Sequence, residues 1–300
     1  MKAFIDPHRD VYGVEPIGNV LPIAPSTDDL QVARESDPAQ RSGRAQRDER
    51  LCGHIQPVWN ENLQAYGADT VWRAWRREGV EVARCTVERL MRRLGLKGVR
   101  RGKPVKTTVS NPKAAGPEDR VNRPFTAERP NALWVSDFTE VSTAPGFVSV
   151  AFIVDGFARY LVGWKVSRSA RTDVVRDALE QALCARPPFG PSRLIHPGDR
   201  GGPYGSIRST ERRAEAGIAP SVGSVGDSYD HALAETLHGL YKAEVIHRTS
   251  WQSLETVEWA TLTWVDGFNH RRLLEPMGYI PPAEAEAAYY RQLTESARVA

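Results

Sequence analysis

Cysteine and long apolar runs are the features that this sequence most plainly lacks. Its 300 residues include only three cysteines, Cys52, Cys85 and Cys184, and no two of them form a CxxC pair. That scatter argues against a disulfide framework and against a zinc knuckle. No apolar run is long enough to cross a bilayer, and charges in the first ten residues interrupt any signal-peptide core. We therefore expect a protein of the reducing cytoplasm with no membrane partner.

Net charge is also low, at +3 for the whole chain, but it is unevenly distributed. Residues 71–106 contain twelve Lys and Arg against three Glu, a local charge of +9, so the remainder is acidic. A basic block of this size on one small domain is typical of a protein that binds nucleic acid. The hydrophobic share of 41% is enough for a folded core.

The first part of the chain shows little periodicity. Residues 1–45 predict an N-terminal extension with a short helix near its start. Within it, residues 26–45 are polar and charged without an apolar repeat, which is typical of a linker.

Residues 46–106 predict a small helix-turn-helix-like domain of three helices. We expect the first helix to break near residues 53–57, where Gly and Pro occur, and the second to be capped by Asp69 and Thr70 and to stop at Gly79. The third is the most basic. A basic helical hairpin that only packs against other elements stays open as an alternative.

The rest of the chain predicts a basic linker over residues 107–125, an α/β core over 126–248 and a C-terminal helical segment over 249–300. The core begins with three short β-rich runs joined by Gly-containing links, which favour antiparallel strands. Helix and strand then alternate. The expected strands are 133–141, 147–154, 160–166, 193–196 and 217–222, and the expected helices are 172–185, 206–216, one from residue 230, and 251–266.

Three carboxylates are candidates for a functional site. Asp137 interrupts an apolar strand, and Asp199 follows a short apolar run and precedes a glycine-rich loop. Thirty-five residues separate Asp199 from Glu235, which lies in a helix where it shares one face with His231, His238 and Lys242. For an isolated helix, a solvated acid and base stripe is the plainer interpretation. Taken together, two strand carboxylates and one helix carboxylate make an all-oxygen site suited to Mg²⁺ or Mn²⁺, and two such ions support phosphodiester chemistry.

Five segments then carry a family resemblance. They are LWVSDFT, FIVDGFARYLVGWKVS, HPGDRGGPY, SVGDSYDHALAETLHGLYKAEVIH and FNHRRLLEPMGYIPP, and they occur in this order along nearly the whole chain. The chain resembles the catalytic subunit of bacterial insertion-sequence transposases, which share a retroviral-integrase core with a DD(35)E triad. The resemblance implies an α/β, ribonuclease-H-like integrase core with a mixed five-stranded sheet, preceded by a small all-α helix-turn-helix-like domain.

The resemblance also assigns roles to residues. It makes Asp137, Asp199 and Glu235 the catalytic metal ligands, with two Mg²⁺ or Mn²⁺ ions when DNA is bound. His231 stands where relatives usually carry Asn, and contact with DNA and contact with the ligands are both open for it. His196, three residues before Asp199, is expected beside that ligand. A packing role for His196 stays open. Basic side chains are expected to contact DNA, namely Lys242, Arg84, Arg89, Arg92, Arg93, Arg100 and Arg101.

Other polar residues have structural explanations at this stage. Asp155 ends a core strand beside Arg159, and we expect a turn or an ion pair there. Asp230 is expected to cap the helix that carries Glu235. For the run Asn269–Arg272, DNA contact and a structural cap are equally open.

The function expected is metal-dependent DNA cleavage and strand transfer by a bacterial, cytoplasmic transposase. Its expected partners are the inverted-repeat ends of the element, target DNA, further copies of the chain, and the product of an upstream helix-turn-helix reading frame. One alternative is a weakened or decayed copy that only binds DNA, because Pro197, Gly198 and Pro203 replace the His, Ser and Gln common in relatives. Another is a ribonuclease H-type hydrolase, against which the basic helical domain argues.

Overall fold

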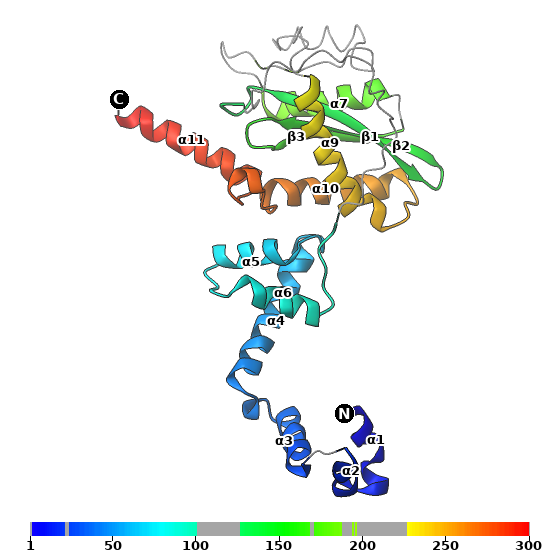
Figure 1. Cartoon of the computed structure of the whole chain (residues 1–300). Coiled ribbons are helices and arrows are strands. Elements are labelled where there is room, and N and C mark those ends of the chain that lie inside the picture. Colours follow the sequence, from blue (N-terminus) through cyan, green and yellow to red (C-terminus); the bar gives the residue numbers. More distant parts are fainter. Residues whose placement is uncertain are drawn as a thin grey trace, which may run out of the picture.

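The computed structural model describes residues 2–21, 24–100, 127–168, 171–187, 194, 196 and 227–299. Figure 1 shows N-terminal helices, a helical domain and an α/β core with C-terminal helices, in that order along the chain. None of the helices in these ranges is both apolar enough and long enough to cross a membrane.

The N-terminal extension is more helical than its composition predicts. α1 (Lys2–Tyr12) agrees with the short helix expected there, and it is followed by α2 (Val14–Val20). The linker predicted over residues 26–45 is wrong, because α3 (Pro25–Ser36) and the 3₁₀ turn η1 (Pro38–Gln40) lie in it. Proline at the first turn of α3 has the φ angle that a helix needs, and Asp37 accepts a hydrogen bond from the Ala39 amide to start η1. A helix started in this way need not contain an apolar repeat, so the absence of one did not exclude a helix here.

The helical domain comprises residues 43–100. Its helices enclose a small apolar core in which Ile55, Trp75 and Leu90 are fully buried. The helices are α4 (Gly43–Glu61), α5 (Ala68–Arg77) and α6 (Arg84–Arg93).

Two details of this domain differ from the sequence prediction. α4 continues through Pro57, so the expected break is wrong. Pro57 has no N–H to donate to the Gly53 carbonyl, but Gly53 is exposed, so water can hydrogen-bond to that carbonyl. Ile55, between the two, is buried in the domain core, and this packing stabilises the helix through the proline. α5 has Gly67, not Asp69 or Thr70, at its N-cap. Gly79, with φ of 78°, follows α5 as expected, and Gly95, with φ of 71°, follows α6 in the same way.

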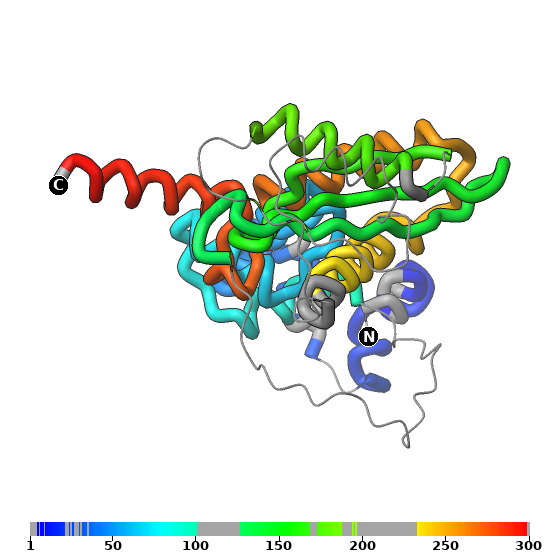
Figure 2. The backbone as a smooth tube through the Cα atoms, turned by 90° about the horizontal axis from the view of Figure 1, so that it is seen from above, coloured from blue at the N-terminus to red at the C-terminus, as the bar shows by residue number. Residues whose placement is uncertain are grey.

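Within the described residues the core sheet contains three antiparallel strands in the order β1–β2–β3, which are the first three strands predicted. Successive side chains alternate between its two faces. One face, with Trp134 and Ile153, packs against α7; the other, with Phe152, packs against α9 and α10 (Figures 1 and 2). The elements are β1 (Trp134–Thr143), β2 (Gly146–Asp155), β3 (Leu161–Ser167), α7 (Arg171–Ala185), α9 (Asp227–Glu244) and α10 (Leu254–His270).

α9 begins at Asp227, so the prediction that Asp230 caps it is wrong: Asp230 lies inside the first turns. Aspartate is favoured near the start of a helix, both at the cap and in the first turns, because the helix dipole attracts negative charge there. The aspartate at 230 therefore indicated a start three residues too late. The helix and strand expected over 206–222, and most of the strand at 193–196, lie outside the described residues.

The C-terminal segment contains the 3₁₀ turns η3 (Ile246–Arg248) and η4 (Glu275–Met277) and the helix α11 (Pro282–Val299). α10 starts with a reciprocal capping box between Ser253 and Thr256. The face of α10 that lies in the core contains the buried Val257, Thr261, Trp264 and Val265. The second half of α11 is exposed and projects away from the core (Figure 2).

Candidate active site

Asp137 lies in the middle of β1, on the sheet face that α9 covers. Its backbone pairs in register with Phe152 of β2, and its side chain is 32% exposed, so it is reachable from solvent although its strand is in the core. A partly exposed carboxylate is unusual at this position, because its partner across the sheet is the fully buried Phe152.

Glu235 lies on α9 between two points where that helix contacts β1. On one side Ala234 packs with Val135, and on the other His238 approaches Asp137, with Nε2 3.5 Å from Oδ2. Glu235 itself is exposed. The structure therefore carries Asp137 and Glu235 on two elements in direct contact.

His238 is the residue at this site whose importance the sequence did not reveal. It is 6% exposed and its ring packs against Phe152, at 5.4 Å between centroids. Burial, opposed by the Asp137 backbone hydrogen bond and helped by Lys242, lowers the pKa of His238 to about 4. Its imidazole is thus neutral at physiological pH. The available signal was its spacing of three residues from Glu235 on one helix face.

Two residues that precede Asp199 in the sequence, Leu194 and His196, also lie against β1. Leu194 is buried in the cluster that contains Trp134, and the fully buried His196 has its Nε2 2.9 Å from the Ser136 hydroxyl oxygen. His196 therefore packs next to the residue that precedes Asp137. Asp199 itself, and the side chain of His231, lie outside the described residues.

Within the described ranges no three His, Cys, Asp or Glu side chains form a group that could hold a metal, and Asp199 is not among those residues. The two carboxylates that are described, at 137 and 235, are accessible oxygen donors of the kind Mg²⁺ prefers. Their chemistry fits such an ion.

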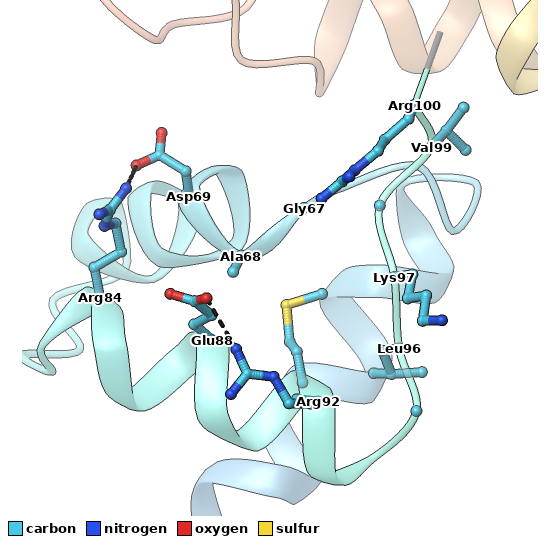
Figure 3. A pocket seen from close by; sticks show the side chains of 13 residues that line it. Gly67, Ala68, Asp69, Arg84, Glu88, Arg92, Leu96, Lys97, Val99 and Arg100 are labelled. Atoms are coloured by element: carbon cyan, nitrogen blue, oxygen red, sulfur yellow. Dashed lines mark hydrogen bonds and ion pairs between the residues drawn. The ribbon is translucent and has the colours of Figure 1, made fainter. Parts of the chain in front are cut away.

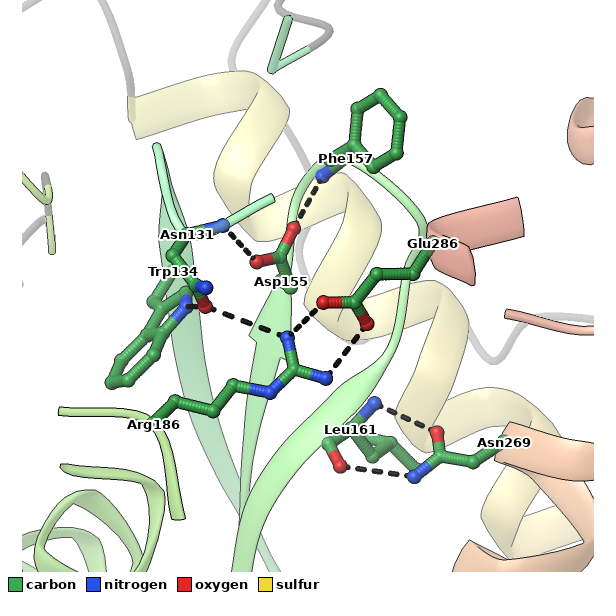
Figure 4. A network of polar contacts seen from close by, with 8 residues as sticks. All are labelled: Asn131, Trp134, Asp155, Phe157, Leu161, Arg186, Asn269 and Glu286. Atoms are coloured by element: carbon green, nitrogen blue, oxygen red, sulfur yellow. Dashed lines mark hydrogen bonds and ion pairs between the residues drawn. The ribbon is translucent and has the colours of Figure 1, made fainter. Parts of the chain in front are cut away.

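Asp155 has a structural role, as its place at a strand end predicts (Figure 4). It is 1% exposed and accepts hydrogen bonds from the amides of Asn131, at 2.6 Å, and Phe157, at 2.8 Å. Burial raises the pKa of Asp155, opposed by these two hydrogen bonds and by the charge of Arg186. The nearby Arg186 forms a two-pronged ion pair with Glu286.

The closing run expected either to contact DNA or to cap the core is partly structural. Asn269, 4% exposed, donates to the Leu161 carbonyl at 3.0 Å and accepts from the Leu161 amide at 2.8 Å. Arg272 donates to the buried Glu244 at 2.6 Å.

The basic side chains of the helical domain fall into two groups. Arg84, Arg92 and Arg100 line a cavity of about 920 Å³ beside α6, with Asp69 and Glu88 (Figure 3). We call this cavity the basic groove. Arg84 and Arg92 are 62% and 76% exposed.

Arg89 differs from these. Its guanidinium donates to Asp48 of α4 at 2.8 Å, and the Asp48 side chain is only 10% exposed. This hydrogen bond lowers the pKa of Asp48 against the effect of its burial. Arg89 thus ties α6 to α4. Arg93 is exposed, and Arg101 is outside the described residues.

Family models match both parts of the chain. An HTH-like domain model matches residues 46–104, and integrase core domain models match residues 127–228 and 216–282. The chain is 56% identical to the transposase for insertion sequence element IS629 of Shigella sonnei, over 98% of both chains. It is 52% identical to a putative transposase for IS986/IS6110 of Mycobacterium tuberculosis, over 91% of this chain and 98% of the relative.

The chain belongs to the insertion-sequence transposases. Its function is thus DNA transposition, and its fold is an integrase-type, ribonuclease-H-like core behind a helix-turn-helix-like domain. As such it is a DNA-binding enzyme that cuts and transfers DNA, in a family that uses divalent metal. Among solved structures, the HTLV-2 integrase catalytic core with magnesium superposes with a TM-score of 0.40 and 16% identity, over 53% of this chain and 98% of that one. So distant a likeness adds nothing to the assignment.

Proposed function

We propose that this transposase is of the DDE type, with Asp137, Asp199 and Glu235 as the ligands of two divalent metal ions, Mg²⁺ or Mn²⁺, when DNA is bound. The observation that supports this most is the accessible Asp137 carboxylate beside α9, where Glu235 lies between the two contacts of that helix with β1. The metal ions would supply activation of the attacking oxygen and stabilisation of the leaving oxygen.

The chain's own residues then have separate tasks. The three carboxylates fix the place at which the phosphodiester reacts, and His238 orients the first of them. Lys242, on α9 seven residues after Glu235, supplies a positive charge for a DNA phosphate. The exposed Arg84, Arg92, Arg93 and Arg100 bind the phosphate backbone from the helical domain.

The substrates we propose are the inverted-repeat ends of the element and then target DNA, with several copies of the chain assembled on them. The product of an upstream helix-turn-helix frame completes end recognition. We also propose that function divides along the chain at the expected boundaries, with DNA recognition in residues 46–106 and catalysis in 126–248.

The test is a cleavage and strand-transfer assay with the full chain and a duplex that contains an element end. Activity is expected with Mg²⁺ or Mn²⁺ and none with EDTA. Asp137→Asn, Asp199→Asn and Glu235→Gln should each abolish both steps and leave DNA binding in a gel shift intact. Glu295→Gln, on the exposed end of α11, is the matched control and should behave as wild type.

A variant among the three that keeps near-normal strand transfer is not a metal ligand. Binding without any cleavage by the wild-type chain would instead support the decayed copy that Pro197, Gly198 and Pro203 suggest.

A further inference from the structure

The C-terminal residues 269–286, which we call the closing segment, are fixed to the catalytic core at three points. Asn269 pairs with both backbone groups of Leu161 in β3, Arg272 donates to Glu244 at the end of α9, and Glu286 pairs with Arg186 after α7. The Glu244 carboxylate also accepts from the Trp264 indole at 2.9 Å. The closing segment is therefore in direct contact with α9, the helix that carries Glu235.

The same segment contacts the helical domain through Tyr66. This tyrosine is 5% exposed; its hydroxyl donates to the Arg271 carbonyl at 2.9 Å and accepts from the Leu273 amide at 3.1 Å. Its ring lies in the helical-domain core. Burial raises the pKa of Tyr66, so the hydroxyl stays protonated and can make both bonds.

A second contact involves α5 and the turn after η4. The Arg73 guanidinium lies 3.4 Å from the centre of the Tyr279 ring, and Arg77 donates to the Tyr279 carbonyl and forms an ion pair with Glu284. Gly278 and Tyr279 both have positive φ, 72° and 62°, so the turn holds the ring in a defined place.

A third contact surrounds the turn between α4 and α5. Arg248 of η3 donates to the Leu63 carbonyl and, at 3.1 Å, to the Gln64 side chain. Leu63 packs against the core cluster of the catalytic domain. Buried polar, cation–π and apolar contacts thus cover one side of the helical domain, while Arg84 and Arg92 lie in the basic groove and form none of them.

We infer that the closing segment is a docking platform that holds the helical domain of the same chain at a fixed distance from α9. DNA bound in the basic groove would then be presented to Glu235 by one rigid unit and not by two independently moving domains. Tyr66 is the centre of this interface, because it is its most buried polar group.

The 26 residues between 100 and 127 span about 90 Å at full extension, so the helical domain of a second copy could also reach the platform. Docking within one chain is favoured because the Val99 amide donates to the Ala65 carbonyl at 3.0 Å. Val99, near the end of the helical domain, therefore lies beside the docked turn, and effective concentration favours the domain of the same chain.

Hydrogen exchange of the full chain, followed at the Leu273 amide, tests the interface without any need for catalysis. Tyr66→Phe keeps the ring but removes the hydroxyl, and exchange at Leu273 should become about tenfold faster, the equivalent of one lost hydrogen bond. Tyr12→Phe, at a tyrosine 65% exposed in α1, is the control and should change nothing. Unchanged exchange in Tyr66→Phe would overturn the inference.

Charge reversal separates docking within one chain from docking between copies. Arg77→Glu and Glu284→Arg should each speed exchange at Leu273, and the double variant should restore it. An equal mixture of the two single variants should stay fast, because each molecule contains a like-charged pair. Recovery in the mixture would show that a second copy supplies the helical domain, and no effect of either single variant would overturn the platform itself. Binding of end DNA should be unchanged throughout, which keeps a failure here distinct from a failure of the proposed catalysis.

Discussion

The carboxylate of Asp137 and the imidazole of His238 meet across the contact between β1 and α9, with Oδ2 and Nε2 3.5 Å apart. The histidine is neutral, buried and held by its packing on Phe152. The Asp137 carboxylate therefore lies beside a ring whose position is set by packing.

His238→Ala should lower both metal affinity and the strand-transfer rate by about 10–100-fold, because partners that orient a metal ligand are worth this much. His238→Asn keeps a hydrogen-bond donor and should lose less. Metal affinity measured by calorimetry gives a readout independent of turnover. Equal affinities for wild type and His238→Ala would show that the contact is incidental.

Arg92→Ala and Arg89→Ala should affect DNA binding differently although the two residues share one helix. Arg92 is exposed in the basic groove, so its loss should weaken DNA binding and reduce the slope of log affinity against log salt by about one. Arg89→Ala should leave that slope unchanged. Fluorescence anisotropy at several salt concentrations measures both, and a reduced slope in Arg89→Ala would contradict the assignment.

Arg89→Ala should instead lower the midpoint of thermal unfolding, because Asp48 loses its partner. Arg89 lowers the pKa of Asp48, so the unfolded chain binds more protons than the folded one below the ordinary pKa of 3.8. The stabilisation is therefore complete above that pH and is lost as pH falls further. Melting curves of both proteins should converge on acidification, and a constant difference would exclude this ion pair as its source.

Arg272→Ala should cost about 3–5 kcal/mol in the free energy of unfolding, because it leaves the Glu244 carboxylate, 5% exposed, without its cation. Glu244→Gln removes the charge together with the need for a partner, and keeps an oxygen for Trp264, so it should cost less. Urea unfolding measures both values. The reverse order would show that the pair is not what stabilises this end of α9.

Gly163→Ala should destabilise the core by about 1–3 kcal/mol, the usual cost of overpacking. A Cβ at this position of β3 would lie 2.3 Å from the Ala178 carbonyl oxygen and 3.0 Å from the Ala182 Cβ on α7. Gly53→Ala, in α4, is the control: its Cβ would meet nothing within 4 Å, and alanine favours a helix. Urea unfolding should separate the two, and equal stabilities would mean that α7 can move away.

The sequence predicted best where a pattern is local and repetitive. The β-rich runs with Gly-containing links in 133–166 and the helical pattern in 251–266 gave the strands and α10 within a few residues. α3 was missed because a polar surface helix has no apolar repeat to detect. The break at Pro57 was wrongly expected because proline signals only the loss of one backbone hydrogen bond. The stabilisation from burying Ile55 nearby cannot be seen in the local sequence.

The site was only partly predictable for a related reason. Asp137 and Glu235 are conspicuous because a carboxylate in a strand and an acid on a helix face can be seen in one segment. The burial of His238 depends on Phe152, 86 positions earlier. In the sequence Arg89 and Arg92 look equivalent. Only the structure shows that Arg89 pairs with Asp48 of another helix. Such pairings need the fold itself.

The alternation of β1 also limits how this gene can change. Ser136 contacts His196 on the α7 side of the sheet, and Asp137 contacts His238 on the α9 side. A single codon inserted or deleted between residue 134 and residue 137 would exchange the two sides and turn the carboxylate away from Glu235. Insertions in this strand should therefore be tolerated only in pairs, whereas most point substitutions there leave the carboxylate on its own side.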